Sequence, residues 1–327
     1  MKISIKHLSM FLIAICFSIH TSLLSADLNE NIKRTFKVKE GGTLTVDTDL
    51  GSINVKTSSN EIVDVEVIRE LKAWGSKRSK DLIEKFSVDF NQNEGDVEII
   101  GKKEEDWTKK WNDIRIEFII TVPKKYNLNL NTSGGEISVD DLDGEVKAKT
   151  SGGSLHFGNI AGYVDGKTSG GGINLAGCQA DVNIRTSGGN IGIGDVEGNV
   201  NAHTSGGSIN IIKAMGEIIA RTSGGSIKVE EAMGAIDAST SGGSVTAYIS
   251  QQPKQDCRLK TSGGSVKVYL AINVPVDVDA KTSSGRVKSE FDITGVVEKR
   301  SVRGEINGGG PELYLRTSGG DISILKK

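Results

Sequence analysis

The sequence is poor in the residue types on which most catalytic and metal sites depend. Its 327 residues include only 3 cysteines and 4 histidines, and aromatic side chains make up 5% of the chain. The formal net charge is −2, so the bulk attraction that draws basic proteins to nucleic acid is lacking. Beyond the amino terminus, no apolar run is long enough to span a membrane. We therefore expect no nucleic-acid partner and no transmembrane segment in the mature chain.

The first 26 residues are predicted to be a secretory signal peptide. Lys2 and Lys6 give a basic start, an apolar run from Met10 to Ile19 follows, and Ser25-Ala26 offers a small-residue cleavage site. A bulky isoleucine precedes Cys16, where a lipidation site needs a small residue, so soluble export is favoured over a lipid anchor. The mature protein is expected in the periplasm, at the cell surface or outside the cell.

Glycine is abundant, with 41 residues, and much of it belongs to one repeated tetrapeptide, T-S-G-G. From Thr132 to Thr240 this tetrapeptide returns every 18 residues, and longer steps lead to three further copies. The copies begin at Thr132, Thr150, Thr168, Thr186, Thr204, Thr222, Thr240, Thr261, Thr282 (as T-S-S-G) and Thr317. A fixed period of this length is the signature of a repeat architecture.

Each repeat predicts two short β-strands joined by tight turns. In residues 132–149, apolar side chains occupy the sixth and eighth positions (Ile137, Val139) and the fifteenth and seventeenth (Val146, Ala148). Spacing of two is strand alternation, and no helical spacing of three and four persists. The eleventh position adds a third apolar row. One unit cannot bury its apolar side alone, but stacked copies form a continuous core with strands about 4.8 Å apart.

The T-S-G-G motif is interpreted as a corner of the stack. Its second glycine is present in all ten copies, which indicates a backbone that needs φ > 0 or leaves no room for a Cβ. The threonine points inward, so its hydroxyl must find a partner such as a turn backbone or the next threonine. Ten serine nucleophiles in a row make no chemical sense, so a catalytic serine is disfavoured.

These features predict an all-β protein: a parallel β-solenoid with rungs of about 18 residues, in the style of a β-helix, behind a β-rich N-terminal cap. The signal peptide would comprise residues 1–26, the cap region 27–130 and the solenoid 131–327. The cross-section is either flattened between two sheets or triangular. Near the carboxyl end, residues 295–315 interrupt the period and predict a hairpin or loop. The final Lys326-Lys327 pair is expected to blunt an exposed edge.

Four stretches carry a resemblance to a known family. They are GGTLTVDTDLGSINV, the junction ITVPKKYNLNLNTSGGEISV, the T-S-G-G repeats and the closing INGGGPELYLRTSGGDISI. Together they resemble the bacterial putative-adhesin family of β-strand-repeat proteins, a domain of unknown function. The resemblance implies a β-helix-like solenoid located outside the cytoplasm, and it brings no catalytic residues.

A basic residue precedes most copies of the motif and is expected to point outward. Stacking would align these residues into a stripe made of Lys149, Lys167, Arg185, His203, Arg221, Lys260, Lys281 and Arg316. Two unit charges about 5 Å apart in water repel by only about 0.8 kcal/mol, so the stripe is tolerable without a ligand. It is either a solvated face of mixed charge or a docking strip for an anionic polysaccharide or an envelope protein.

The remaining candidates give no site that the sequence supports. The two cysteines of the mature chain, Cys178 and Cys257, lie four repeats apart, or about 19 Å, which exceeds the reach of a disulfide. The turn positions that bind calcium in β-rolls hold isoleucine or valine here, so neither metal nor cofactor is expected. Three further features have a bland interpretation that is favoured. The cluster Asp140, Asp141 and Asp143 is a solvated turn more readily than a stray-ion site, and His156 and His203 sit at outward strand positions with no nucleophile and carboxylate beside them. The pair Trp107 and Trp111 anchors the cap loop more readily than it stacks on sugar.

The function hypothesis is an exported, non-catalytic adhesin or scaffold that binds a polymer or protein along the flank of the solenoid. The alternative is a polysaccharide lyase or hydrolase built on the same frame, which would need converging acids in an outer groove.

Overall fold

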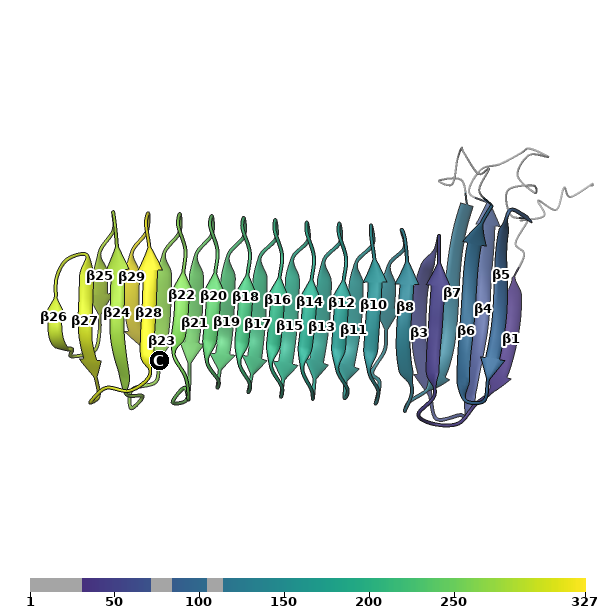
Figure 1. The fold of residues 1–327 in the computed structure, drawn as a ribbon, viewed down its shortest axis with the longest axis horizontal. Coiled ribbons are helices and arrows are strands. Elements are labelled where there is room, and N and C mark those ends of the chain that lie inside the picture. Colours follow the sequence, from purple (N-terminus) through teal and green to yellow (C-terminus); the bar gives the residue numbers. More distant parts are fainter. Residues whose placement is uncertain (1–30, 72–83, 105–113) are drawn as a thin grey trace, which may run out of the picture.

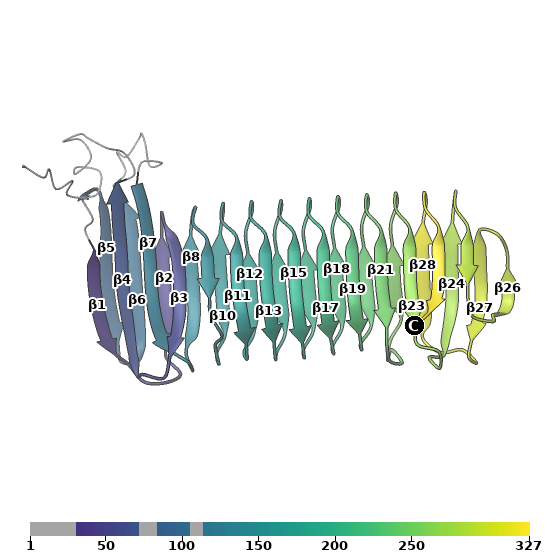
Figure 2. The same ribbon diagram turned by 180° about the vertical axis from the view of Figure 1, so that it is seen from behind.

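The computed structural model describes residues 31–71, 84–104 and 114–327. The predicted signal peptide and the pair Trp107 and Trp111 lie outside these residues. The described chain forms a long rod of two β-sheets that face each other, with 14 strands in sheet A and 15 in sheet B (Figure 1). Figure 2 shows the same rod from behind, with the strands of successive repeats following one another between the two ends.

The T-S-G-G repeats alternate between the two sheets, one strand in each, and neighbouring repeat strands pair in parallel. In sheet A these strands are β9 (Ile137–Val139), β11 (Leu155–Ile160), β13 (Ile173–Cys178), β15 (Ile191–Val196), β17 (Ile209–Ala214), β19 (Ile227–Ala232), β21 (Val245–Ile249) and β23 (Val266–Leu270). In sheet B they are β8 (Asn127–Thr132), β10 (Val146–Thr150), β12 (Val164–Lys167), β14 (Val182–Arg185), β16 (Val200–His203), β18 (Ile218–Arg221), β20 (Ile236–Ser239) and β22 (Cys257–Lys260). The predicted parallel solenoid is confirmed.

The core consists of files of apolar side chains that run along the rod. Ile137, Leu155, Ile173 and Ile191 are register partners in successive strands of sheet A, and each is at most 2% exposed. The eleventh-position residues are buried as well, and from β11 onward they close the same sheet A strands. The cross-section is therefore flattened between two sheets, and the triangular alternative is wrong.

The corner interpretation of T-S-G-G is confirmed by its hydrogen bonds. The Oγ1 of Thr150 donates to the carbonyl oxygen of Gly135 in the rung before at 2.8 Å, and it accepts from the backbone N–H of Gly153 at 3.4 Å. A Cβ on Gly153 would lie 2.1 Å from that same carbonyl oxygen. Each corner threonine is thus buried and bonded between two rungs, and the fourth position admits only glycine.

The amino-terminal end combines one more rung with an antiparallel cap. Its strands are β1 (Ile32–Lys37), β2 (Thr43–Thr48), β3 (Ser52–Ser58), β4 (Ile62–Leu71), β5 (Phe86–Asn93), β6 (Asp96–Lys103) and β7 (Ile114–Pro123). Strands β2 and β3 stack in parallel on β8 and β9, and Thr48 aligns with Thr132 as if it belonged to another repeat. Beyond them, β4, β1 and β5 pair antiparallel, which ends the parallel stack.

The carboxyl-terminal end departs from the order of the sequence. Its strands are β24 (Val276–Thr282), β25 (Val287–Ser289), β26 (Thr294–Val297), β27 (Ser301–Ile306), β28 (Glu312–Thr317) and β29 (Ile322–Lys326). The predicted hairpin exists as β26 and β27, and β27 pairs antiparallel with β24. Because the hairpin takes one side of β24, the last repeat lies on the other side, between the repeats that begin at Thr261 and Thr282.

One expectation about this end is therefore wrong. Strand β29, which carries Lys326, is paired on both sides, with β23 and with β25. The terminal lysines cannot blunt an outer edge of the sheet. That edge is formed by the three-residue strand β25 in sheet A and by the hairpin strand β26 in sheet B.

Candidate functional site

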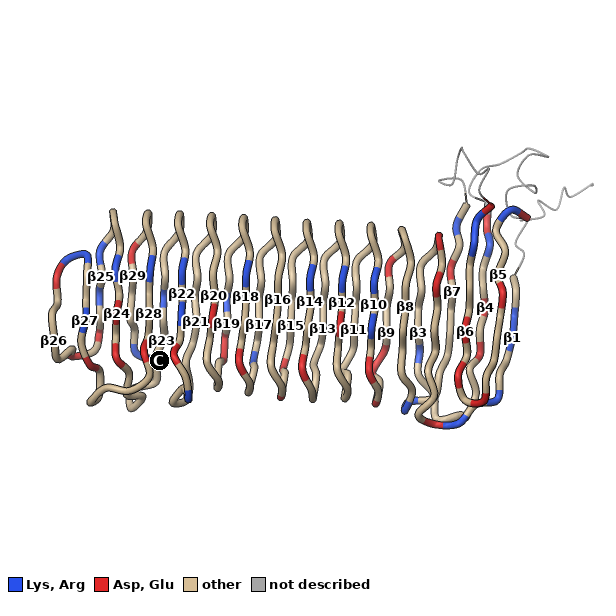
Figure 3. Tube along the Cα trace, viewed as in Figure 1, with Lys and Arg blue, Asp and Glu red and all other residues tan. Residues whose placement is uncertain are grey.

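The predicted basic stripe is a single file on the outer face of sheet B. Register pairing joins Lys149 to Lys167, Lys167 to Arg185, Arg185 to His203 and His203 to Arg221. The file continues after Ser239 through Lys260, Arg316 and Lys281, so the inserted last repeat places Arg316 between the other two. Figure 3 shows these basic segments at a similar height on β10, β12, β14 and β18. We call this row the cationic file.

Two arginines in the carboxyl-terminal part of the cationic file are neutralised by their own neighbours, whereas Lys260 and Lys281 have no ion pair among the described residues. Arg221 pairs with Asp237 at 2.6 Å, and Arg316 pairs with Asp279 at 2.8 Å. The guanidinium of Arg316 also lies 3.8 Å from the ring centroid of Tyr314. Burial by itself raises the pKa of Asp279, but hydrogen bonds from Arg316 and Arg303 outweigh it and lower the pKa. These two arginines contribute to the structure rather than to a free binding surface.

The amino-terminal part of the file carries free charge. Within the described chain, no ion pair engages Lys149, Lys167 or Arg185. Around the first two lies a hollow of about 290 Å³ in sheet B. We call it the lysine hollow; its lining residues are Asn129, Leu130, Asn131, Lys147, Ala148, Lys149, Asp165 and Lys167. Three ammonium groups from β10 and β12 thus meet one carboxylate, which makes the hollow suitable for an anion.

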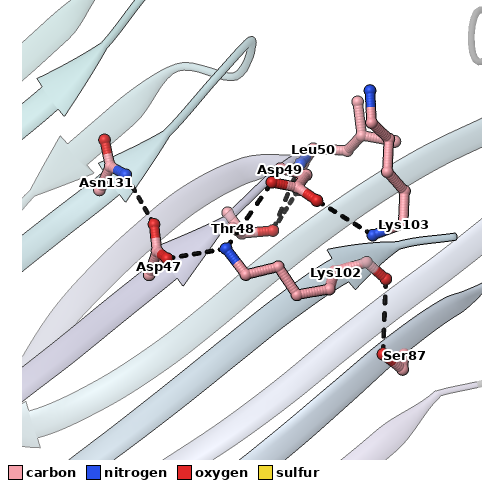
Figure 4. A network of polar contacts seen from close by, with 8 residues as sticks. All are labelled: Asp47, Thr48, Asp49, Leu50, Ser87, Lys102, Lys103 and Asn131. Carbon is pink, nitrogen blue, oxygen red and sulfur yellow. Dashed lines mark hydrogen bonds and ion pairs between the residues drawn. The ribbon is translucent and has the colours of Figure 1, made fainter. Parts of the chain in front are cut away.

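A hydrogen-bond network ties the rim of the lysine hollow to the cap (Figure 4). The side-chain amide of Asn131 donates to Asp47 at 2.6 Å, and Lys102 donates to the other oxygen of Asp47 at 2.8 Å. The hydrogen bonds from Lys102 and Asn131 hold the pKa of Asp47 below its usual value. Asn131 is therefore fixed in orientation, and its carbonyl oxygen is turned away from Asp47.

The other residues singled out in the sequence do not assemble into a catalytic or metal site. His156 lies 3.7 Å from Glu136, with both side chains largely exposed. Asp141 accepts hydrogen bonds from the backbone and side chain of Asn159. In residues 31–71, 84–104 and 114–327, no group of three or more metal-ligating side chains is found. The cysteines are unpaired, as their predicted separation requires. Both are buried, and burial raises the pKa of Cys257 to about 11.

Sequence reasoning missed a larger depression on the outer face of sheet A. This trough has a volume of about 800 Å³ and crosses strands β9, β11, β13, β15 and β17. Its lining residues are Thr57, Ser138, Val139, Asp140, Asp141, His156, Phe157, Gly158, Asn174, Leu175, Ala176, Gly192, Ile193, Gly194, Asn210 and Ile212. The signal was present at the ninth repeat position, which holds Gly158, Ala176 and Gly194 in three successive repeats and larger residues such as Glu230 and Tyr248 later.

A family model matches most of the chain. The model, named Toastrack DUF4097, matches residues 42–325. The chain belongs to the Toastrack DUF4097 family. This confirms the resemblance seen in the T-S-G-G repeats, and it assigns no activity to the Toastrack protein described here.

The chain also matches solved structures of bacterial proteins. One, described as a putative cell adhesion protein from Clostridium sporogenes, is 15% identical, and the match covers 91% of this chain and 100% of that one, with a TM-score of 0.23. A putative adhesin from Bacteroides fragilis is 15% identical over 91% and 97% of the two chains, with a TM-score of 0.33. One from Parabacteroides distasonis is 14% identical over 91% and 97%, with a TM-score of 0.26. No curated protein matches the chain.

No helix among the described residues is long and apolar enough to cross a membrane.

Proposed function

We propose that this Toastrack protein is an exported, non-catalytic scaffold of the cell envelope that holds an anionic polysaccharide along the flank of sheet B. The observation that carries the proposal is the free charge of Lys149, Lys167 and Arg185, one cation per rung, beside the lysine hollow. Export is inferred from the basic and apolar start of the chain. The adhesin descriptions of the solved relatives agree with a place outside the cytoplasm.

A polymer suits this arrangement better than a small anion does. A single exposed ion pair contributes roughly 0.2–1 kcal/mol, so one contact would not hold a ligand. Cations repeated about every 4.8 Å along the rod can each meet a charge of an extended polyanion, and linking the contacts raises the overall affinity. The polyanion would also relieve the mutual repulsion of the unpaired cations. Binding should therefore weaken steeply as salt is added.

Charge reversal at the free cations tests the proposal. The triple variant Lys149→Glu, Lys167→Glu, Arg185→Glu is compared with the wild type by affinity electrophoresis in native gels that contain polygalacturonate. A matched control reverses three exposed lysines elsewhere, Lys254, Lys267 and Lys288, and so changes the net charge by the same amount. We expect polygalacturonate to retard the wild type and the control variant, and not to retard the triple variant. Equal behaviour of the two variants would refute a specific role for the cationic file.

The alternative of a polysaccharide lyase or hydrolase makes a different prediction. A general acid at neutral pH needs a raised pKa. In the described part of the chain, the carboxylates with clearly shifted pKa values are Asp47 and Asp279, and both are lowered by cationic neighbours. We therefore expect polygalacturonate to keep its chain length when incubated with the protein. An increase in reducing ends or in unsaturated products, measured over several hours, would overturn the non-catalytic assignment.

A further inference from the structure

The trough on sheet A runs along the rod across five successive repeat strands. Its central row consists of register partners from successive rungs: Ser138, His156, Asn174, Gly192 and Asn210. Beside it, Gly158, Ala176 and Gly194 keep the next row low. Beyond the trough the same two rows carry larger side chains, Lys228, Glu230, Tyr248 and Tyr269 among them. The depression is thus confined to the amino-terminal rungs.

Gly192 is not explained by the fold. Its φ is not positive, and a Cβ at this position would meet only the side-chain amide of Asn174, with Oδ1 at 2.4 Å, which is the end of a flexible side chain. Gly194 differs, because a Cβ there would lie 1.8 Å from the backbone oxygen of Ala176. Glycine within a strand is destabilising relative to residues with side chains, and it often marks a place where a ligand comes close to the backbone. The open floor at Gly192 is therefore kept at a cost to stability.

The lining chemistry selects an uncharged ligand. None of the lining residues is lysine or arginine, and the carboxylates of Asp140 and Asp141 stand at one end, so a polyanion finds no counter-charge. The side-chain amides of Asn174 and Asn210 have no hydrogen-bond partner among the described residues. An amide both donates and accepts, as sugar hydroxyls do. The backbone groups at the floor are already paired within sheet A, which excludes an added peptide strand.

We propose that the trough binds one strand of an uncharged linear polysaccharide, laid along the stacking axis. Asn174 and Asn210 lie two rungs apart, about 9.6 Å, so the two amides can meet equivalent hydroxyls of a polymer with a regular repeat. The exposed apolar side chains of the trough are those of Ala176 and Ile212, and they can contact the less polar face of the sugar rings. This site lies on the opposite sheet from the cationic file and takes a different ligand class, so it is independent of the function proposed above.

The experiment is affinity electrophoresis of the mature protein in native gels that contain mixed-linkage β-glucan, glucomannan or arabinoxylan. Ala176→Trp fills the trough with a residue that strands favour, and Ile219→Trp places the same side chain on the outer face of sheet B as a matched control. We expect at least one of the polymers to retard the wild type and the control, and Ala176→Trp to weaken binding at least tenfold. Retardation should persist in 0.5 M NaCl, unlike that caused by a polyanion.

A second variant separates binding from folding. Gly192→Thr should raise the melting temperature, because a β-branched residue replaces a strand glycine, and yet it should weaken binding by a similar factor. If none of the uncharged polymers retards the wild type, or if Ala176→Trp binds as the wild type does, the proposal is wrong. A Gly192→Thr variant that is more stable and binds with unchanged affinity would also refute it.

Discussion

The corner threonines should be worth more to stability than their small size suggests, and Thr204 is the best place to measure it. This side chain is 0% exposed and lies in the middle of the rod. Its Oγ1 donates to the carbonyl oxygen of Gly189 at 2.9 Å and accepts from the N–H of Gly207 at 3.3 Å. Valine has nearly the same shape but no hydroxyl, so Thr204→Val would leave both backbone groups without this partner.

The expected loss follows from these two contacts. A buried polar group that loses its partner costs about 1–3 kcal/mol. Water can reach part of this corner, since the neighbouring Ser205 is exposed, so we expect a loss of about 2 kcal/mol for Thr204→Val. Thr204→Ser keeps the hydroxyl and gives up one buried methyl group, which costs about 0.8 kcal/mol. Ser205→Ala, one residue away and exposed, should cost less than about 0.5 kcal/mol.

Urea unfolding followed by circular dichroism gives the three free-energy changes, provided that the denaturant slope is the same in all variants. Because a repeat array can open locally, hydrogen exchange at the amide of Gly207 provides a second, local measurement. Exchange there should accelerate in Thr204→Val and stay slow in Thr204→Ser. If valine proves as stable as threonine, or if Ser205→Ala costs as much as Thr204→Val, the hydroxyl does not join the rungs as described.

Three further outcomes follow from the structure. The pKa of Asp47 in the folded state is lowered by Lys102, so the stability that its carboxylate contributes is present above the unfolded pKa near 3.9 and is lost as the pH falls through the folded value. The urea midpoint should therefore drop below pH 4, and the drop should be smaller in Asp47→Asn. The thiol of Cys257, with a pKa of about 11 and 2% exposure, should react with a thiol reagent at pH 8 only after urea is added. Leu315→Ala, in the inserted last repeat, should cost about 2–5 kcal/mol by urea unfolding, whereas Val297→Ala on the outer hairpin should cost less than about 0.5 kcal/mol.

The sequence predicts the structure of one repeat in detail, because in every rung the inward positions must bury apolar side chains and the corners must satisfy a buried threonine hydroxyl. The file from Ile137 to Ile191 and the bonded threonines follow from alternation and from the need to satisfy a buried hydroxyl. The order of rungs is different. Every T-S-G-G repeat offers the same parallel edges, so no local pattern states that β28 lies between β22 and β24. Only the antiparallel pairing of β27 with β24 makes that order necessary.

The candidate site could be predicted only in part for a related reason. The alternation of inward and outward side chains along a strand places Lys149 and Lys167 outward, and the structure agrees. This alternation does not indicate which cations are neutralised by a neighbouring carboxylate. Arg316 meets Asp279 across strands that lie 37 residues apart in the chain. The trough was missed because a glycine or alanine at an outward position looks like ordinary variation when one repeat is considered alone. It becomes a surface feature only when Gly158, Ala176 and Gly194 are stacked.

Residues that stabilise the stack and residues that can bind a ligand occupy different positions in each repeat. Inward and corner residues are explained by stacking alone. Binding residues are therefore expected on the outer faces, where the sequence departs from the repeat pattern. Both departures noted above fall at the same end of the rod: the lysine hollow lies on β10 and β12 of sheet B, and the trough lies on β9 to β17 of sheet A. The later rungs carry paired charges and stacked side chains, such as Tyr248 and Tyr269 with ring centroids 4.2 Å apart. Both proposed binding surfaces therefore lie toward the cap end of the rod, and variants in the carboxyl-terminal rungs should affect stability without affecting either.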